Sequence, residues 1–290
     1  MSFRTIVIES RCKLEYSLNY LVCRKGNEEH KVLLDEIKTI IINSVQVSIT
    51  TSLISECLEK KIKIIFTDSK HNPTGELVPY FNNFYSYKKI KEQMTFDQDS
   101  KDLLWQYITK EKIKNQARNL QFSNKIDAYD KLINYIDEVE IGDASHREGH
   151  AAKVYFNALF GNHFSRDYDC LINRCLNYGY AIILSAINRE IKALGYLTEL
   201  GVHHIGESNN FNLGCDFMEP LRPYVDYYVI NNMVDDDTYK SKYTEILKEY
   251  VKYNERVIIL DNAIKLYVED LFSYLKTGDL SKISFISYEL

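Results

Sequence analysis

The chain has 290 residues, of which 45% are hydrophobic and 27% charged, with a formal net charge of −5, so it is a globular protein rather than a disordered or collagen-like one. No apolar run reaches the roughly 18 residues of a membrane span and no signal peptide is evident, so we expect a cytoplasmic protein with no membrane partner. Six cysteines without a C-x-x-C pair predict reduced thiols and no structural zinc.

Residues 1–80 are predicted to be mostly β. Short β-branched runs alternate with turn signals such as Lys25–Asn27, and one helix is expected over 49–60. A buried strand follows at KIKIIFTDS, and His71–Gly75 reads as a turn. This pattern predicts a small sheet or sandwich with one helix packed on it. Its sheet edges are the candidate dimer interface.

Residues 81–100 are predicted to form a linker that enters a helix, and residues 101–290 to form an all-helical domain. The fold class is therefore α+β: a small β-rich N-terminal domain followed by a larger all-α C-terminal domain. Apolar periodicity predicts helices over 101–122, 126–139, 145–161, 177–194, 218–231 and 238–274. The tail from 281 returns to β-like alternation.

The helix predicted over 145–161 has an acid at an awkward position. Ser145 and Glu148 have capping-box spacing, but Glu148 also heads the face that carries Ala151 and Tyr155. Its carboxylate should point into the packed layer, where it needs a cation, a metal or hydrogen-bond donors.

Three further residues could complete a site with Glu148. His204, with His203 beside it, follows Gly195 in a predicted loop, and Asp216 and Glu219 repeat the capping-box spacing. Two carboxylates and an imidazole suit a hard divalent ion such as Mg²⁺ or Mn²⁺, which can polarise a phosphodiester. The same spacings also fit two capping boxes and a loop histidine, so the residues alone leave both interpretations open.

The charge distribution offers a candidate DNA track. Residues 84–125 carry 9 Lys/Arg against 5 Asp/Glu, in a chain that is acidic overall. Aromatic residues in this stretch could stack on bases, although core packing is favoured for Trp105; they are Phe84, Tyr85, Tyr87 and Trp105. Candidate phosphate contacts are Arg147, Lys153, Arg189, Arg222, Lys88, Lys89 and Lys91. Ion pairing within the helical bundle is an equally good interpretation of Arg189 and Arg222.

Three segments resemble the Cas1 integrases of CRISPR adaptation, most closely those of type II-A systems. They are REGHAAKVYFNALFG, LNYGYAIILSAINREI and GVHHIGESNNFNLGCDFMEPLRPYVD. The resemblance implies a metal-dependent DNA integrase that joins the 3′-hydroxyl ends of a prespacer duplex to repeat DNA by transesterification. It implies that Glu148, His204 and Glu219 ligate Mg²⁺ or Mn²⁺ and that Asp216 assists. His204 rather than His203 fits the family's distance to the D-x-M-E-P motif.

The resemblance also implies partners: a homodimer of this chain, a central Cas2 dimer and, in type II-A systems, Cas9 and a ring-shaped accessory DNA-binding protein. Two other functions would use the same residues. One is a stand-alone metal-dependent nuclease acting on branched or single-stranded DNA. The other is a non-catalytic DNA-binding scaffold in which the carboxylates only cap helices.

Overall fold

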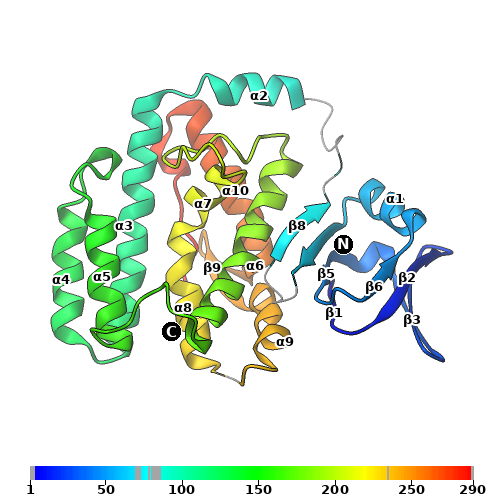
Figure 1. The fold of residues 1–290 in the computed structure, drawn as a ribbon. Coiled ribbons are helices and arrows are strands. Elements are labelled where there is room, and N and C mark those ends of the chain that lie inside the picture. Colours follow the sequence, from blue (N-terminus) through cyan, green and yellow to red (C-terminus); the bar gives the residue numbers. More distant parts are fainter. Residues whose placement is uncertain (1–3, 69–72, 78, 80–85, 234, 289–290) are drawn as a thin grey trace. The chain divides into compact units, whose positions relative to one another are not determined.

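The computed structural model describes residues 4–68, 73–77, 79, 86–233 and 235–288. The chain divides into two compact units, residues 1–84 and 85–290 (Figure 1). Phe84, Tyr85 and the His71–Asn72 part of the predicted turn lie outside the described residues.

The first unit contains two four-stranded sheets. In one, the order is β1 (Arg4–Ile8), β5 (Ile37–Ile42), β7 (Lys63–Thr67), β8 (Pro73–Leu77), with only β8 antiparallel to its neighbour. In the other, the order is β4 (Glu28–Leu33), β3 (Tyr20–Lys25), β2 (Cys12–Ser17), β6 (Val47–Ile49). The connection between the parallel strands β5 and β7 passes through β6 and α1 (Thr51–Glu59).

The core of this unit is formed by the β-branched strands. Leu14, Ile40, Leu53 and Ile64 are completely buried in one cluster shared by the sheets and α1. The turn predicted at Lys25–Asn27 connects β3 to β4, with Gly26 at φ +59°. The predicted turn at His71–Gly75 is wrong at its C-terminal end, because Pro73–Gly75 belong to the edge strand β8.

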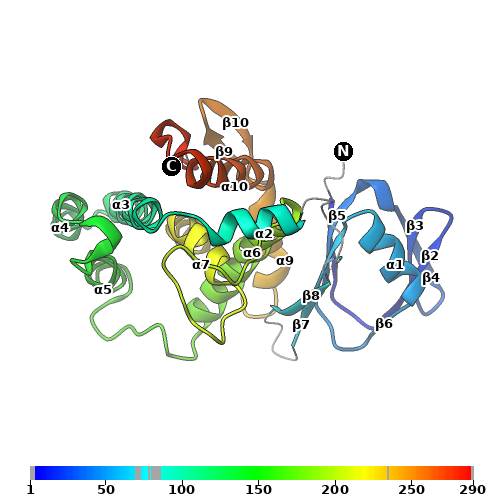
Figure 2. The same ribbon diagram turned by 90° about the horizontal axis from the view of Figure 1, so that it is seen from above.

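The second unit is mostly helical. Figure 2 shows one group of helices that lie together, α3 (Gln98–Phe122), α4 (Ile126–Asp137) and α5 (Arg147–Phe160). They share a buried cluster that includes Ile113, Leu120, Leu132 and Tyr155. A second, larger core is formed mainly by α6 (Leu171–Ala193), α7 (Asn212–Met218), α8 (Arg222–Asn231), α9 (Tyr239–Tyr243) and α10 (Leu260–Thr277). The helix α2 (Ser86–Met94) lies within the stretch predicted as a linker.

One predicted helix is wrong. Residues 238–274 contain a β-hairpin of β9 (Tyr250–Tyr253) and β10 (Arg256–Ile259) between α9 and α10. Asn254 and Glu255 adopt positive φ angles of 47° and 61°, as a two-residue hairpin turn requires. The β-like tail is confirmed in part, since Ser287 pairs with Lys252 beside this hairpin.

The structure confirms the α+β class, with a β-rich part followed by a mostly helical part. Among the described residues, no helix is both long enough and apolar enough to cross a membrane. All six cysteines are free thiols.

Candidate active site

Glu148 stands in the first turn of α5, but the start of that helix differs from the predicted capping box. Asp143, not Ser145, accepts hydrogen bonds from the backbone N–H groups of Arg147 (2.8 Å) and Glu148 (3.1 Å). Ser145 instead donates to the carbonyl of Glu138. Because Asp143 satisfies the helix start, the Glu148 side chain is left to make other contacts.

The second predicted capping box is also wrong. Asp216 lies inside α7 rather than before it, and Glu219 begins a short 3-10 turn, Glu219–Leu221, that leads into α8. Pro220 and Pro223 occupy first-turn positions of these two segments, where a missing N–H costs little. The break between α7 and α8 turns the Glu219 side chain into the interior, where it is 6% exposed.

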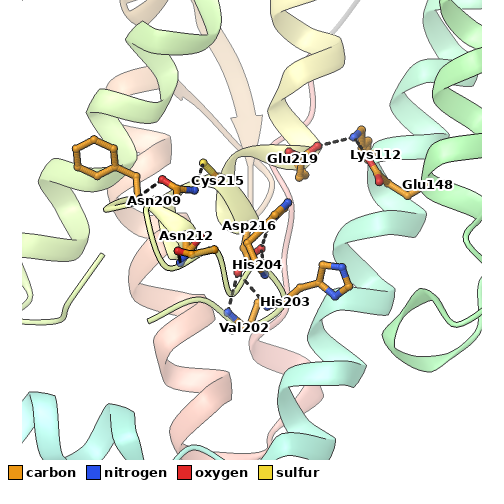
Figure 3. Close-up of polar contacts among 12 residues, drawn as sticks. Lys112, Glu148, Val202, His203, His204, Asn209, Asn212, Cys215, Asp216 and Glu219 are labelled. Carbon is orange, nitrogen blue, oxygen red and sulfur yellow. Dashed lines mark hydrogen bonds and ion pairs between the residues drawn. The ribbon is translucent and has the colours of Figure 1, made fainter. Parts of the chain in front are cut away.

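Glu148 and Glu219 meet on one cation. The ammonium of Lys112, from the middle of α3, contacts Glu148 and lies 2.5 Å from Oε2 of Glu219 (Figure 3). The other oxygen of Glu219, Oε1, accepts from Nε of Arg222 at 2.7 Å. The two acids therefore come from elements far apart in the sequence and face a common point.

The pKa values follow this pairing. Burial alone would raise the pKa of Glu219, but the charges of Lys112 and Arg222 outweigh it and lower that pKa to about 2. Burial alone would lower the pKa of Lys112, but Glu219 and Glu148 outweigh it and raise that pKa. Both groups are thus held in their charged forms at neutral pH.

His204 is fixed by Asp216. The fully buried Asp216 carboxylate accepts hydrogen bonds from the backbone N–H groups of Val202, His203 and His204, at 2.7, 3.0 and 3.1 Å. It also lies 2.5 Å from Nδ1 of His204 (Figure 3). A ring that bonds a carboxylate through Nδ1 presents Nε2 outward, which is the usual arrangement of a metal-ligating histidine.

A glycine allows the loop to close over this carboxylate. A Cβ on Gly201 would lie 2.2 Å from the carbonyl oxygen of His204 and 2.8 Å from Oδ2 of Asp216. The backbone can therefore approach Asp216 this closely only because residue 201 has no side chain.

His203 and His204 differ in their surroundings. The ring of His203 stacks on the buried indole of Trp105, with centroids 4.1 Å apart and planes at 3°. Burial lowers the pKa of His203, whereas the hydrogen bond to Asp216 raises the pKa of His204. The ring of His203 is therefore packed against Trp105, and His204 is the better candidate for a metal ligand. Trp105 lies in the core, so it is not a base-stacking surface.

The donor set fits a hard divalent ion in its chemistry. Within the described residues, no three His, Cys, Asp or Glu side chains already converge at ligand distance. Two carboxylates nevertheless bracket a cation, and the pKa of His204 is raised in part by the charges of Glu219 and Glu148, so the three lie in one neighbourhood. Carboxylate oxygens with one imidazole suit Mg²⁺ or Mn²⁺.

The lysines among the candidate phosphate contacts differ in their exposure. Lys88 and Lys91 on α2 and Lys153 on α5 are exposed. Lys89 is half-buried and donates to the hydroxyl of Tyr196 at 3.2 Å. Tyr87 is 80% exposed and available for stacking.

The three arginines are each engaged. Arg147 pairs with Glu138 at 2.8 Å, Arg222 pairs with Glu219, and both keep 28% of the side chain exposed. Arg189 is different: it is 11% exposed and pairs with Glu190 and Asp261. This placement favours the bundle ion pair over a phosphate contact for Arg189.

Sequence reasoning missed Lys112. The sequence contains a signal for its burial. Leu104, Ile108 and Lys112 have i, i+4, i+8 spacing, which places the lysine on the same helix face as two apolar residues. A lysine on such a face is buried and needs a partner. A cavity of about 520 Å³ was not anticipated either; it borders His204 on the side of Gln93, Leu200 and Asn209, and neither Glu148 nor Glu219 lines it.

The fold is shared with solved structures of other proteins. A casposase bound to an integration product matches with a TM-score of 0.77 at 17% identity, over 96% of this chain and 92% of that one. A Cas6-RT-Cas1–Cas2 complex matches with a TM-score of 0.76 at 17% identity, over 97% of this chain; this chain spans 36% of the matched one. At these identities, the likeness establishes the fold alone.

The sequence comparisons establish the family. The family model for CRISPR associated protein Cas1 matches residues 5–270. The CRISPR-associated endonuclease Cas1 of Neisseria meningitidis serogroup C (strain 8013) is 34% identical over 251 residues, which are 87% of this chain and 82% of that protein. The chain belongs to the Cas1 family.

Proposed function

We propose that this chain is a metal-dependent DNA integrase of CRISPR adaptation. It joins the 3′-hydroxyl ends of a short prespacer duplex to the two strands of CRISPR repeat DNA. The observation that carries the proposal is the meeting of Glu148 and Glu219 on one cation, in the neighbourhood of a histidine held by Asp216. The family match and the casposase neighbour, which is bound to an integration product, support it.

Each residue of the site has a distinct role in this proposal. Glu148, Glu219 and Nε2 of His204 would hold Mg²⁺ or Mn²⁺, which stabilises negative charge on phosphate oxygens when bound. Asp216 keeps His204 in the Nδ1–H tautomer, so it is a positioning residue rather than a ligand. Arg222 orients Glu219 through Oε1.

The reaction is a transesterification. The prespacer 3′-oxygen forms a bond to the repeat phosphorus as the bond from that phosphorus to the 3′-oxygen of the repeat strand breaks. The attacking hydroxyl releases its proton to solvent and the leaving oxygen takes one up, so no water is consumed. The exposed Lys88, Lys91 and Lys153 are the candidate backbone contacts.

The partners follow from the same proposal. The chain acts as a homodimer, with the β-rich unit as candidate interface, around a central Cas2 dimer. Cas1 and Cas2 occur together in the complex whose fold matches. Cas9 and a ring-shaped accessory DNA-binding protein take part in type II-A systems. The reaction takes place in the cytoplasm, where the repeat DNA is.

A strand-joining assay tests the proposal. A labelled duplex is incubated with repeat DNA, the Cas2 dimer and Mn²⁺ or Mg²⁺. Glu148→Ala and Glu219→Ala should abolish joined product, and the surface variant Glu245→Ala, which loses a pair with Lys248, should retain it. Full joining activity in either active-site variant would show that the assignment is wrong.

A second candidate is a stand-alone metal-dependent nuclease, and the name of the N. meningitidis relative, an endonuclease, favours it. The same residues would then direct water rather than a DNA hydroxyl. Hydrolysed ends without any joined product, in the presence of Cas2 and repeat DNA, would support this function. A non-catalytic scaffold would instead leave DNA capture intact in Glu148→Gln and show no divalent-ion shift in a thermal melt.

A further inference from the structure

Lys112 occupies an unusual position for a lysine. Its side chain is 7% exposed, and its ammonium lies between Glu148 and Glu219 (Figure 3). Burial of an unpaired ammonium is strongly unfavourable, and one carboxylate would be enough to pair it. Here two carboxylates face the same ammonium, and they are two of the proposed metal ligands.

The charges of this cluster balance. Glu148 and Glu219 carry two negative charges, and Lys112 and Arg222, which pairs with Glu219 at 2.7 Å, carry two positive ones. A divalent ion added to this balanced, partly buried cluster leaves an excess of two positive charges, which is unfavourable where the surroundings are less polar than bulk water. Both oxygens of Glu219 already face a cation, Oε2 the Lys112 ammonium and Oε1 the Arg222 guanidinium, so a metal that binds Glu219 competes with them.

We propose that Lys112 is the counter-cation of the metal-free active site, and that metal entry requires its ammonium to withdraw from Glu148 and Glu219. This inference rests on the proposed function, because it takes those two residues as metal ligands. The ammonium is a compact charge on a flexible four-carbon stem, which suits a group that must vacate a position without refolding of its helix.

The proposal links metal binding to DNA binding. With Lys112 still nearby, a bound metal leaves the site too positive until phosphates arrive to compensate. Metal affinity should therefore be weak in the free protein and stronger with DNA. Affinity coupling of this kind is reciprocal, so the metal should strengthen DNA binding by the same factor. Without Lys112, the free protein should bind metal tightly and depend less on DNA.

The test compares Mn²⁺ affinity in wild type, Lys112→Met and Lys114→Met, measured by calorimetry with and without a prespacer duplex. Lys114 is the matched control, since it lies on the same helix, is 55% exposed and pairs with Glu111 at the surface. We expect Lys112→Met to bind Mn²⁺ at least about ten-fold more tightly than wild type without DNA, because one competing unit charge is gone. The strengthening by DNA should shrink in the same variant, and Lys114→Met should match wild type.

The outcomes separate this inference from the proposed function. Unchanged or weaker Mn²⁺ binding by Lys112→Met, with wild-type binding that is lost in Glu219→Ala, overturns the inference and leaves the metal site standing. Absence of Mn²⁺ binding by wild type with or without DNA overturns both. If Lys112 had only a structural role, Lys112→Met would lower stability without making Mn²⁺ binding tighter.

A measurement on the wild-type protein covers a failure of Lys112→Met to fold. In a crystal structure of the wild-type chain with Mn²⁺, the Lys112 ammonium should no longer lie between Glu148 and Glu219. If the ammonium remains between both carboxylates while Mn²⁺ is bound to them, the proposal is wrong.

Discussion

Glu219 and Asp226 make an informative pair, because they are neighbouring acids with opposite behaviour. Glu219 begins the turn before α8 and Asp226 lies within α8, and they are only 4% and 1% exposed. Burial tends to raise the pKa of both. The pKa of Glu219 is nevertheless lowered to about 2, while that of Asp226 is raised to about 6.

The difference lies in the partners. Glu219 faces the ammonium of Lys112 and the guanidinium of Arg222, whereas Asp226 accepts from the hydroxyl of Tyr180. Tyr180 stands between the two regions, since Arg222 also lies over its ring at 4.8 Å from the centroid. Burial alone therefore does not define a reactive acid. The facing cations keep buried Glu219 charged, whereas the hydroxyl that Asp226 accepts from does not offset the cost of burying its charge.

The largest expected effect comes from removing the charge at Glu219. Glu219→Gln should lower the free energy of unfolding at pH 7 by about 3–5 kcal/mol, because Lys112 and Arg222 lose a shared buried carboxylate. The pKa of Glu219 is lowered from 4.5 to about 2, so this stabilisation is present above pH 4.5 and disappears as pH falls toward 2.

Denaturant titrations of wild type and Glu219→Gln at pH 7, 4 and 3 would measure this effect. Glu245→Gln at the surface should change little at any of these values. A difference between Glu219→Gln and wild type that stays constant over this range would contradict the pKa assigned to Glu219.

The next effect concerns the histidine that shares the site with Glu219. Asp216→Asn should weaken Mn²⁺ binding about 10–100-fold, because the buried carboxylate orients His204. Asp216 also raises the pKa of His204, so wild type should lose Mn²⁺ affinity as pH falls through a value above the ordinary 6.5.

Calorimetric titrations of Mn²⁺ between pH 8 and pH 5.5 would test this expectation. In Asp216→Asn the midpoint should move down toward 6.5, whereas the surface variant Asp236→Asn should keep the wild-type profile. A flat wild-type affinity over this range would argue against His204 as a ligand.

Removal of the charge at Asp226, the second acid of the pair, should raise rather than lower the free energy of unfolding at pH 7. Because the pKa of Asp226 is raised from 3.8 to about 6, ionisation above pH 3.8 favours the unfolded chain until about pH 6. Asp226→Asn removes that cost, worth at most about 3 kcal/mol. The variant should gain stability relative to wild type as pH rises from 4 to 7. Chemical denaturation at pH 4 and pH 7 would show this gain, and a pH-independent difference would mean that the fold does not raise the pKa of Asp226.

The smallest expected effect is steric. Gly201→Ala places a Cβ 2.2 Å from the His204 carbonyl oxygen, so the loop must shift, at a cost of about 1–3 kcal/mol and with weaker Mn²⁺ binding. Gly149→Ala, where nothing lies within 4 Å, should instead stabilise α5 by about 0.5–1 kcal/mol. Thermal melts of both variants would reveal the contrast, and equal effects would exclude close packing of the loop.

The sequence by itself determined most of the secondary-structure elements and the candidate residues of the site. Short β-branched runs identify the N-terminal strands, and 3.6-residue periodicity identifies α3, α4, α5 and α6, because both patterns are local. The hairpin β9–β10 was missed although its signal was also local: two short β-branched or aromatic runs around Asn254–Glu255. The placement of Glu148 on an inward helix face also required only the spacing of its neighbours.

Only the tertiary structure decided which partner each acid has. Asp216 holds the His204 loop instead of starting a helix, because its hydrogen bonds depend on where the chain returns in space. The replacement of Ser145 by Asp143 at the start of α5 is a local contact, set by the conformation of the turn before the helix. Lys112 reaches Glu148 and Glu219 from a helix far from both in the sequence. Charges interact through distance in space rather than along the chain, so the sequence named the two acids, and the fold placed a lysine between them.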